Sequence, residues 1–265
     1  MQRTENECGA PDPLAPISAI INADDLGMSD EVNEAIIYSL ARNHITSTTV
    51  LANGPRVKEA ASRARCFSGA SFGVHLNLTE FEPLTSGLSR HLSTIRALWR
   101  GNRMTLPAVE PVILGAVYEE WCCQIERLFS LGFSVSHMDS HHHIHTVPSL
   151  FPALKAVQRK FGIRKVRISR NVYSSDSKVS PALALSKRAF NWALRRIYST
   201  RTTDAFTDFV TFYETMNEEA RRSAGTIELM VHPGAVGSDQ ESRLLRSDWR
   251  ANAVIPVNLI SYRRL

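Results

Sequence analysis

Short runs of apolar and β-branched residues alternate along the chain with longer segments whose apolar positions recur at helical spacing. The runs that predict strands are 17–22, 47–53, 71–78, 134–139, 165–169, 208–213 and 226–232. Between most of them lie segments that predict helices, one after Ser29 and others over 55–66, 112–131, 148–161, 181–199 and 216–224. Ser29 and Asp30 can cap free backbone N–H groups at the start of the first helix.

Strand–helix alternation of this kind predicts a parallel sheet, which can stay open or close into a barrel. Acidic and imidazole side chains stand at the C-terminal ends of the first, third, fourth and last predicted strands. An open sheet need not bring its first and last strands together, whereas a barrel turns all C-terminal strand ends toward one mouth. We therefore expect an α/β fold, a distorted (β/α) barrel that forms one domain over 17–265 behind a flexible N-terminal extension, 1–16. The long, breaker-rich segment 79–110 is typical of a lid or substrate loop.

The densest chemical signal is a tract that holds five of the nine histidines, HMDSHHHIH at 137–145. If the preceding strand continues through this tract, alternation places its odd-numbered residues on one face. We therefore expect the following side chains to point the same way: His137, Asp139, His141, His143 and His145. Burial of such a row is costly unless it binds something, so the tract predicts a ligand site. The alternative is an exposed or tag-like histidine run, which an internal tract interleaved with Met138 and Ile144 does not favour.

A second signal follows the first predicted strand, in the sequence NADDLG at 22–27. The adjacent carboxylates of Asp24 and Asp25 repel each other unless a cation or a proton separates them. A divalent metal ion would hold one carboxylate and leave its neighbour as a base. A helix cap is the alternative interpretation, but Ser29 and Asp30 already supply one.

Two single histidines stand at other strand ends. His75 lies inside the apolar run GVHLNL at 73–78, where a hydrogen-bonded core histidine is the simpler interpretation on its own. His232 precedes a Pro-Gly turn after the last predicted strand, a position suited to proton transfer. Together with the two other signals they predict a site, because four separate strand ends each supply an acid or an imidazole.

The composition is that of a globular enzyme, with 43% apolar and 22% charged residues. The net charge of +5 would suit nucleic acid, but the arginines are mostly spread along the chain without a nucleic-acid motif, so we expect no such partner. We see no secretory signal in the opening residues and no apolar run near the roughly 20 residues that span a bilayer. The four cysteines show no paired spacing, which indicates a reducing, cytoplasmic location.

Four motifs together resemble the YdjC-like carbohydrate deacetylases, also called the ChbG/HpnK group: NADDLG, GVHLNL, HMDSHHHIH and VHPG at 231–234. TSTTVLANGP at 46–55 and RTTDAF at 201–206 extend the likeness over nearly the whole chain. The resemblance implies a barrel-like α/β fold related to polysaccharide deacetylases. It also implies hydrolysis of an acetamido group on a sugar.

The resemblance implies roles for individual residues as well. Asp25, His75 and His141 would bind one divalent metal ion, Zn2+ or Mg2+. Asp24 would be the catalytic base and His232 the proton donor. Around them, Asp139 would orient a histidine, and His143 and His145 would support the ligands or contact substrate. A structural hydrogen bond is an equal alternative for His145, and His142 takes the variable place of the family's DSHxHxH pattern.

Substrate and partners stay open at this point. The expected substrate is an N-acetylated oligosaccharide, glycan precursor or glycolipid, and the rival functions are a metal-dependent phosphoesterase and a non-catalytic sugar- or lipid-binding module. The basic stretch 181–201 carries Leu183, Phe190, Leu194 and Ile197 near one face. It predicts either an outer barrel helix or peripheral contact with an anionic membrane. A homodimer is the default for a soluble enzyme.

Overall fold

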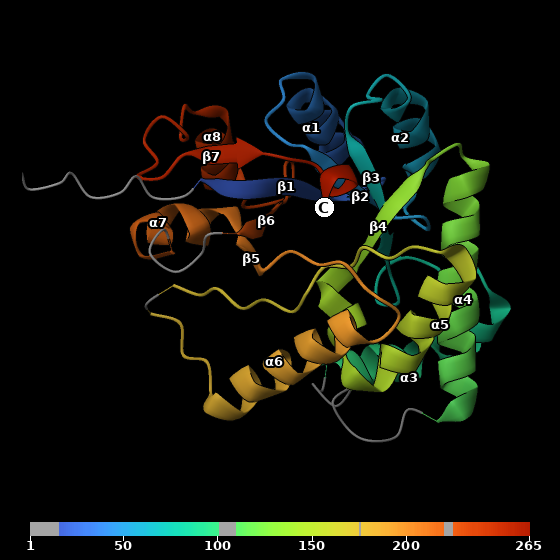
Figure 1. The fold of residues 1–265 in the computed structure, drawn as a ribbon. Coiled ribbons are helices and arrows are strands. Elements are labelled where there is room, and N and C mark those ends of the chain that lie inside the picture. The colour runs from blue at the N-terminus through green and yellow to red at the C-terminus, as the bar shows by residue number, and fades with distance from the viewer. Residues whose placement is uncertain (1–15, 101–109, 175, 220–224) are drawn as a thin grey trace, which may run out of the picture.

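The computed structural model describes residues 16–100, 110–174, 176–219 and 225–265 (Figure 1). Its strands are β1 (Ile17–Leu26), β2 (Ser47–Val50), β3 (Ser71–Leu76), β4 (Val135–Ser140), β5 (Ala205–Asp208), β6 (Thr226–Val231) and β7 (Val257–Leu259). Its α-helices are α1 (Asp30–Ala41), α2 (Val57–Ala64), α3 (Ser86–Arg100), α4 (Pro111–Ser130), α5 (Phe151–Phe161), α6 (Pro181–Arg196), α7 (Phe209–Glu219) and α8 (Asp239–Arg246). Short 3-10 turns accompany them: η1 (His141–Thr146), η2 (Pro148–Leu150) and η3 (Tyr262–Arg264).

The strands form one parallel sheet in the order β4-β3-β2-β1-β6-β5. The short strand β7 pairs with the first residues of β1, from Ile17 opposite Val257 to Ala19 opposite Leu259. Because every strand runs the same way, all C-terminal strand ends lie at one side of the sheet.

The extended segment 165–171 closes the sheet between its two outer strands. The N–H of Arg167 donates to the carbonyl of Met138 in β4 at 3.0 Å, and the N–H of Asn171 donates to the carbonyl of Phe206 in β5 at 3.3 Å. The segment pairs through isolated bridges at Lys165 and Val166, so it is too irregular to form a continuous strand. The expected α/β fold, a distorted barrel, is confirmed.

Alternation along the strands separates an apolar outer face from a polar interior. On β3, Phe72, Val74 and Leu76 join the hydrophobic core, whereas the intervening Gly73 and His75 face the barrel interior, where they lie close to His137 and Asp139 of β4. Gly73 leaves room for a ring: a Cβ atom there would lie 2.6 Å from the imidazole of His137. The centre of the barrel is therefore filled by polar side chains instead of aliphatic ones.

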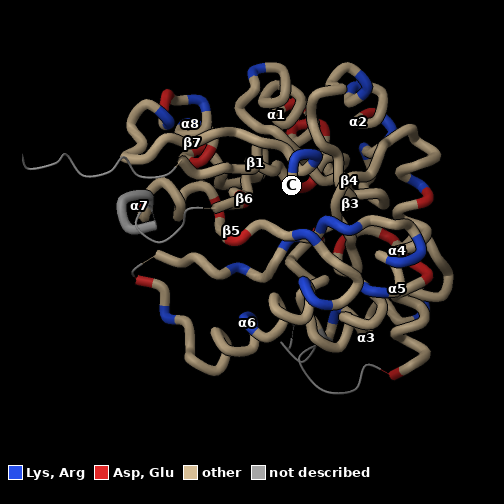
Figure 2. Tube along the Cα trace, in the orientation of Figure 1, with Lys and Arg blue, Asp and Glu red and all other residues tan. Residues whose placement is uncertain are grey.

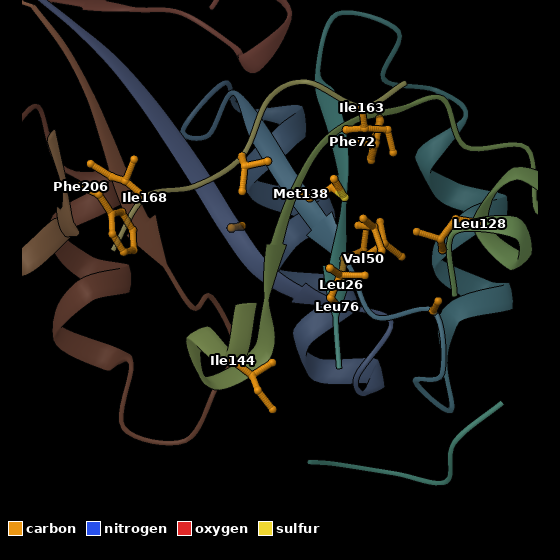
Figure 3. Close-up of a cluster of buried hydrophobic side chains, with 14 of the residues drawn as sticks. Leu26, Val50, Phe72, Leu76, Leu128, Met138, Ile144, Ile163, Ile168 and Phe206 are labelled. Atoms are coloured by element: carbon orange, nitrogen blue, oxygen red, sulfur yellow. The ribbon is translucent and has the colours of Figure 1, made fainter. Parts of the chain in front are cut away.

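The hydrophobic core lies between the sheet and its helices, and Figure 3 shows part of it. Val50 and Leu76 come from adjacent strands, and Leu128 of α4 belongs to the same buried cluster. This packing covers the outer face of the sheet and holds the strands in register. Among the described residues, no helix has both the length and the apolar character needed to cross a membrane.

One predicted strand, 208–213, is wrong. Strand β5 ends at Asp208, whose carboxylate accepts from the N–H of Thr211 at 2.8 Å and so caps the start of α7. Phe209 and Phe212 are both buried, three residues apart, which is helical spacing that the β-branched composition of the run obscured. The predicted helix 216–224 falls partly in α7, and 220–224 lie outside the described residues.

The other differences concern segments without strong periodicity. Helix α3 occupies much of 79–110, where a loop was expected, and 101–109 lie outside the described residues. The predicted strand 165–169 is present only as the irregular closing segment, and β7 and α8 were not predicted. Of the expected N-terminal extension, only Pro16 is described.

Candidate active site

Three side chains from separate elements converge at the C-terminal side of the barrel. Oδ1 of Asp25, near the end of β1, lies 3.2 Å from Nε2 of His75 in β3. The same oxygen lies 2.9 Å from Nδ1 of His141, the first residue of η1. The structure thus brings together the three residues that the resemblance assigns to metal binding, with their ligand atoms all within 4.8 Å of one another.

An irregularity in β1 directs both carboxylates toward this region. In a regular strand, Asp24 and Asp25 would point to opposite faces. The β1–β2 register instead shifts between Ala23 and Leu26, and Asp25 takes a left-handed φ of 73°. A non-glycine residue in this conformation is strained, and such strain is typical of functional positions.

The donor set fits a divalent cation. Nδ1 of His75 lies 2.7 Å from Oδ1 of Asp139, and its Nε2 lies 3.2 Å from Oδ1 of Asp25, so the ring stands between two carboxylates. Burial opposes a charged ring, but Asp139 and Asp24 raise the pKa of His75 well above its ordinary value, which shows how strongly this point attracts positive charge. One carboxylate and two imidazoles also leave open coordination positions.

Asp24 is held by a fully buried arginine. Arg167 donates from Nη1 and Nη2 to the two carboxylate oxygens, each at 2.7 Å. The side-chain amide of Asn22 donates to Oδ1 at 2.9 Å. Burial works against ionisation, yet the charge and hydrogen bonds of Arg167 hold the pKa of Asp24 well below its usual range. Asp24 is therefore a carboxylate at all physiological pH values.

Arg167 also joins the rest of the polar interior. Its Nη1 lies 2.8 Å from Oδ2 of Asp139, and its Nε donates to Oε1 of Glu228 at 2.8 Å. The hydroxyl of Tyr262 donates to the other oxygen of Glu228. Three carboxylates from three strands thus share one guanidinium, which also lies over the ring of Phe206 at 4.8 Å. Burial raises the pKa of Glu228 to about 7, against the attraction of Arg167.

His232 lies across from the three converging residues, at the end of β6. Its Nε2 is 4.0 Å from Oδ2 of Asp24, and its side chain is 35% exposed. Its backbone N–H donates to Oε1 of Glu241 at 2.6 Å, which fixes the turn. Gly234 follows with a φ of 81°, and a Cβ atom there would lie 2.6 Å from the carbonyl oxygen of Glu31, so only glycine fits.

The histidine tract does not form the single row that alternation predicted. Strand β4 ends at Ser140, and His142 and His143 have left-handed φ values of 54° and 55° in η1. This turn reverses the chain, so only His137 and Asp139 keep the alternation of the strand. The expectation of five side chains on one face is wrong.

The remaining histidines of the tract make separate contacts. His137 pairs with Oδ1 of Asn22 at 3.1 Å, away from the converging residues. His145 binds the hydroxyl of Ser140 at 2.5 Å and the carbonyl of Arg167 at 3.0 Å, and burial lowers its pKa to about 3. Such a ring, neutral and bonded at both nitrogens, fits the structural alternative for His145.

His142 and His143 flank this arrangement on two sides. The ring of His142 stacks on Trp99 of α3, with centroids 5.4 Å apart, and its Nδ1 pairs with Thr79 at 3.0 Å. His143 packs edge-on against Phe206, and its buried Nδ1 has no hydrogen-bond partner among the described residues. Helix α3, which lies within the predicted lid segment, therefore contacts the histidine tract through Trp99.

Several residues of the site were not singled out from the sequence. Arg167 and Glu228 each interrupt a predicted apolar strand, in KVRIS and TIELMV, and a charge at an inward strand position is the signal that could have found them. Thr49, whose hydroxyl donates to Oδ2 of Asp139 at 3.0 Å, carries no such signal. Tyr262 lies beyond the last predicted strand, where nothing in the sequence indicates burial.

The family model for YdjC-like proteins matches residues 18–254. The chain belongs to the YdjC-like family. Chitooligosaccharide deacetylases of Escherichia fergusonii and Klebsiella pneumoniae (strain 342) are each 31% identical to it, over 220 and 221 residues, which is 82% of this chain and 81% of each relative. The range matched by the family model includes Asp24, Asp25, His75, His141 and His232.

A solved structure supports the fold. A crystal structure of an Enterococcus faecalis V583 protein, to which cellobiose-phosphate cleavage has been ascribed, superposes with a TM-score of 0.68. It covers 94% of this chain and 99% of its own, at 22% identity. At this identity the likeness extends to the family's fold and to no particular activity.

Proposed function

We propose that this chain is a metal-dependent hydrolase that removes the acetyl group from an N-acetylated sugar and releases acetate. The observation that carries the proposal is the joint placement of Asp25, His75 and His141 beside an ionised Asp24 that has His232 4.0 Å away. The names of the chitooligosaccharide deacetylase relatives support the same reaction and substrate class.

Asp25, His75 and His141 would hold the ion, zinc or magnesium, and Asp139 would orient His75 through Nδ1. When bound, such an ion polarises an acetamide carbonyl and makes a water molecule more acidic. That acidity matters here, because Arg167 keeps Asp24 ionised and thereby makes it a weak base.

The protein's own groups then move the two protons of the reaction. Asp24 accepts a proton from water as the water oxygen forms a bond to the acetyl carbon. His232 donates a proton to the sugar nitrogen as the carbon–nitrogen bond breaks, so that acetate and an amino sugar are released. The 35% exposure of the His232 side chain lets it exchange protons with solvent afterwards.

A metal-dependent phosphoesterase is the rival reaction. It has some support from Glu80 and His142, which form a second potential ligand group that shares His141. Phosphate chemistry also needs free cationic side chains at the site. Arg167, the arginine that binds Asp24, is already occupied by three carboxylates, so it is not available as a phosphate clamp.

Mass spectrometry of acetamido sugars incubated with the purified protein and added zinc or magnesium tests the proposal. The panel includes chitooligosaccharides, nucleotide sugars and glycolipids, with generic phosphate esters alongside. We expect loss of one acetyl group that depends on the metal and on Asp24. Cleavage of the phosphate esters alone would establish the rival, and intact sugars that nevertheless bind in the presence of metal would indicate a non-catalytic binding module.

Four further statements about this protein stay predictions. These are the choice between zinc and magnesium, the cytoplasmic location, a homodimer, and contributions of His143 and His145 to ligand support or substrate contact.

A further inference from the structure

Helix α6 turns an apolar surface away from the barrel. Its inward face buries Phe190, Asn191 and Leu194. On the opposite side, Leu185 and Trp192 are 68% and 63% exposed. They are seven residues apart, or two helical turns, so they lie in line on the outward face. In Figure 1 the helix runs along the lower edge of the molecule.

The surroundings of these two side chains are strongly basic. Arg188 and Arg195 lie on one flank of the outward face and Arg196 on the other, and all three are exposed. Between Asp176 and Asp204 the sequence contains no acidic residue and six cations: Lys178, Lys187, Arg188, Arg195, Arg196 and Arg201. In Figure 2 the tube of α6 carries blue segments and no red ones.

This outward face differs from the one that the sequence predicted. Phe190 and Leu194 were expected near the same face as Leu183 and Ile197, but they bury against the barrel while Leu183 and Ile197 remain 48% and 40% exposed. The exposed pair Leu185 and Trp192 replaces them at the centre of the free surface.

The helix is firmly attached on its inner side. The Asn191 side chain exchanges two hydrogen bonds with the backbone of Ser169, at 2.8 and 3.1 Å. The ammonium of Lys155 donates to the carbonyls of Leu194 and Ile197 at 2.9 and 3.0 Å, and so caps the C-terminal end. The outward face is therefore a fixed surface of the fold.

We propose that the outward face of α6, centred on Leu185 and Trp192 and flanked by Arg188, Arg195 and Arg196, docks on a membrane surface that contains anionic phospholipid. Leucine and tryptophan insert at the boundary between headgroups and acyl chains, and tryptophan favours that depth. The arginines reach phosphate groups beside them. The charge of this region favours an anionic membrane as the partner, because the sequence from 177 to 203 contains no acidic residue that would repel an anionic surface.

Vesicle co-sedimentation of the full chain tests this inference directly. We expect binding to vesicles of phosphatidylcholine with phosphatidylglycerol and little binding to phosphatidylcholine alone. Leu185→Ser with Trp192→Ser should weaken binding about tenfold or more, since two inserted apolar side chains are lost. Arg188→Gln with Arg196→Gln should weaken it about tenfold as well. Val254→Ser, at a site of 59% exposure elsewhere, is the matched control and should bind normally.

Tryptophan fluorescence provides a second measurement. Trp121 and Trp249 are buried and Trp99 is partly buried, so a blue shift on vesicle addition reports on Trp192. The shift should be absent in Trp192→Phe. Binding that is equal on neutral and anionic vesicles, or absent from both, would overturn the inference. So would a dimer in light scattering that Trp192→Ser converts to monomer, because a second copy would then occupy the face.

Discussion

At the level of single residues, the contact between Asp24 and Arg167 has two opposed effects. The guanidinium keeps the carboxylate ionised, and it also withdraws basicity from it. We expect Asp24→Asn to lower turnover on acetamido sugars by about 100-fold or more, while bound metal stays unchanged. Turnover by mass spectrometry and metal content by elemental analysis check this together. Loss of the metal along with the activity would contradict the assignment of Asp24 as the base.

Substitution of His75 or His141 should affect metal binding itself. Each supplies one ring nitrogen close to Asp25, so His75→Ala or His141→Ala should lower metal occupancy in a protein that remains folded. His143→Ala is the matched control from the same tract, since His143 belongs to none of the ligand groups of the described residues. Equal occupancy in all three variants would rule out this ligand set.

Arg167 is the residue on which the polar interior depends most. Arg167→Met would leave Asp24, Asp139 and Glu228 buried without their shared cation, at a cost of about 3–5 kcal/mol in the free energy of unfolding. Arg170→Lys, on the same segment but with a partly exposed ion pair to Asp208, should cost less than about 1 kcal/mol. Denaturant unfolding measures the free energy of unfolding of both variants. Similar losses in the two would show that the buried ion pairs of Arg167 stabilise the fold no more than the partly exposed pair of Arg170.

At the level of elements, the boundary between β5 and α7 depends on one cap. Asp208 accepts from both the N–H and the hydroxyl of Thr211, at 2.8 and 2.9 Å. Asp208→Ala should therefore lower the free energy of unfolding by about 1 kcal/mol. Asp208→Asn, which can still cap, should restore most of it. Full loss in the asparagine variant would point instead to the ion pair with Arg170.

Elements also show where periodicity misleads. The run 208–213 has the composition of a strand, but the cap at Asp208 and the burial of Phe209 and Phe212 make it a helix. Conversely, the strand predicted at 165–169 is real in position and irregular in geometry, because it closes a barrel by bridging β4 and β5. The helices at 111–130 and 181–196 follow their predicted ranges closely, since their apolar stripes are long.

At the level of the whole molecule, the C-terminal segment completes the barrel interior. The ring of Tyr262 is fully buried, stacks on His137 with centroids 3.7 Å apart, and donates a hydrogen bond to Glu228. Tyr262 thus contacts the same network that positions Asp24. The burial of Tyr262 therefore links the C-terminal segment to the site.

The burial of Glu228 in this network predicts that the stability of the protein depends on pH. The pKa of Glu228 is raised from 4.5 to about 7 in the folded protein, so between these pH values the folded state binds more protons than the unfolded state. The contribution of Glu228 to the free energy of unfolding therefore declines as pH rises from about 4.5 to about 7. Glu228→Gln should remove this decline, so the difference in unfolding free energy between wild type and variant should change across that interval. A difference that is constant over the whole of that interval would show that Glu228 is ionised throughout.

The α/β class, the strand ends that supply the acids and imidazoles, and the family can all be inferred from the sequence alone. Those features are local, since parallel strands carry their C-terminal residues to one side whatever their order. Which of these residues contact one another depends on the three-dimensional fold. An irregularity in β1 directs the side chain of Asp25 to the same side as that of Asp24. The turn after Ser140 separates His141 from His143 and His145. Arg167 forms ion pairs with Glu228, which is 61 positions away in the sequence, and with Asp24, which is 143 positions away. No periodicity in the sequence relates residues so far apart.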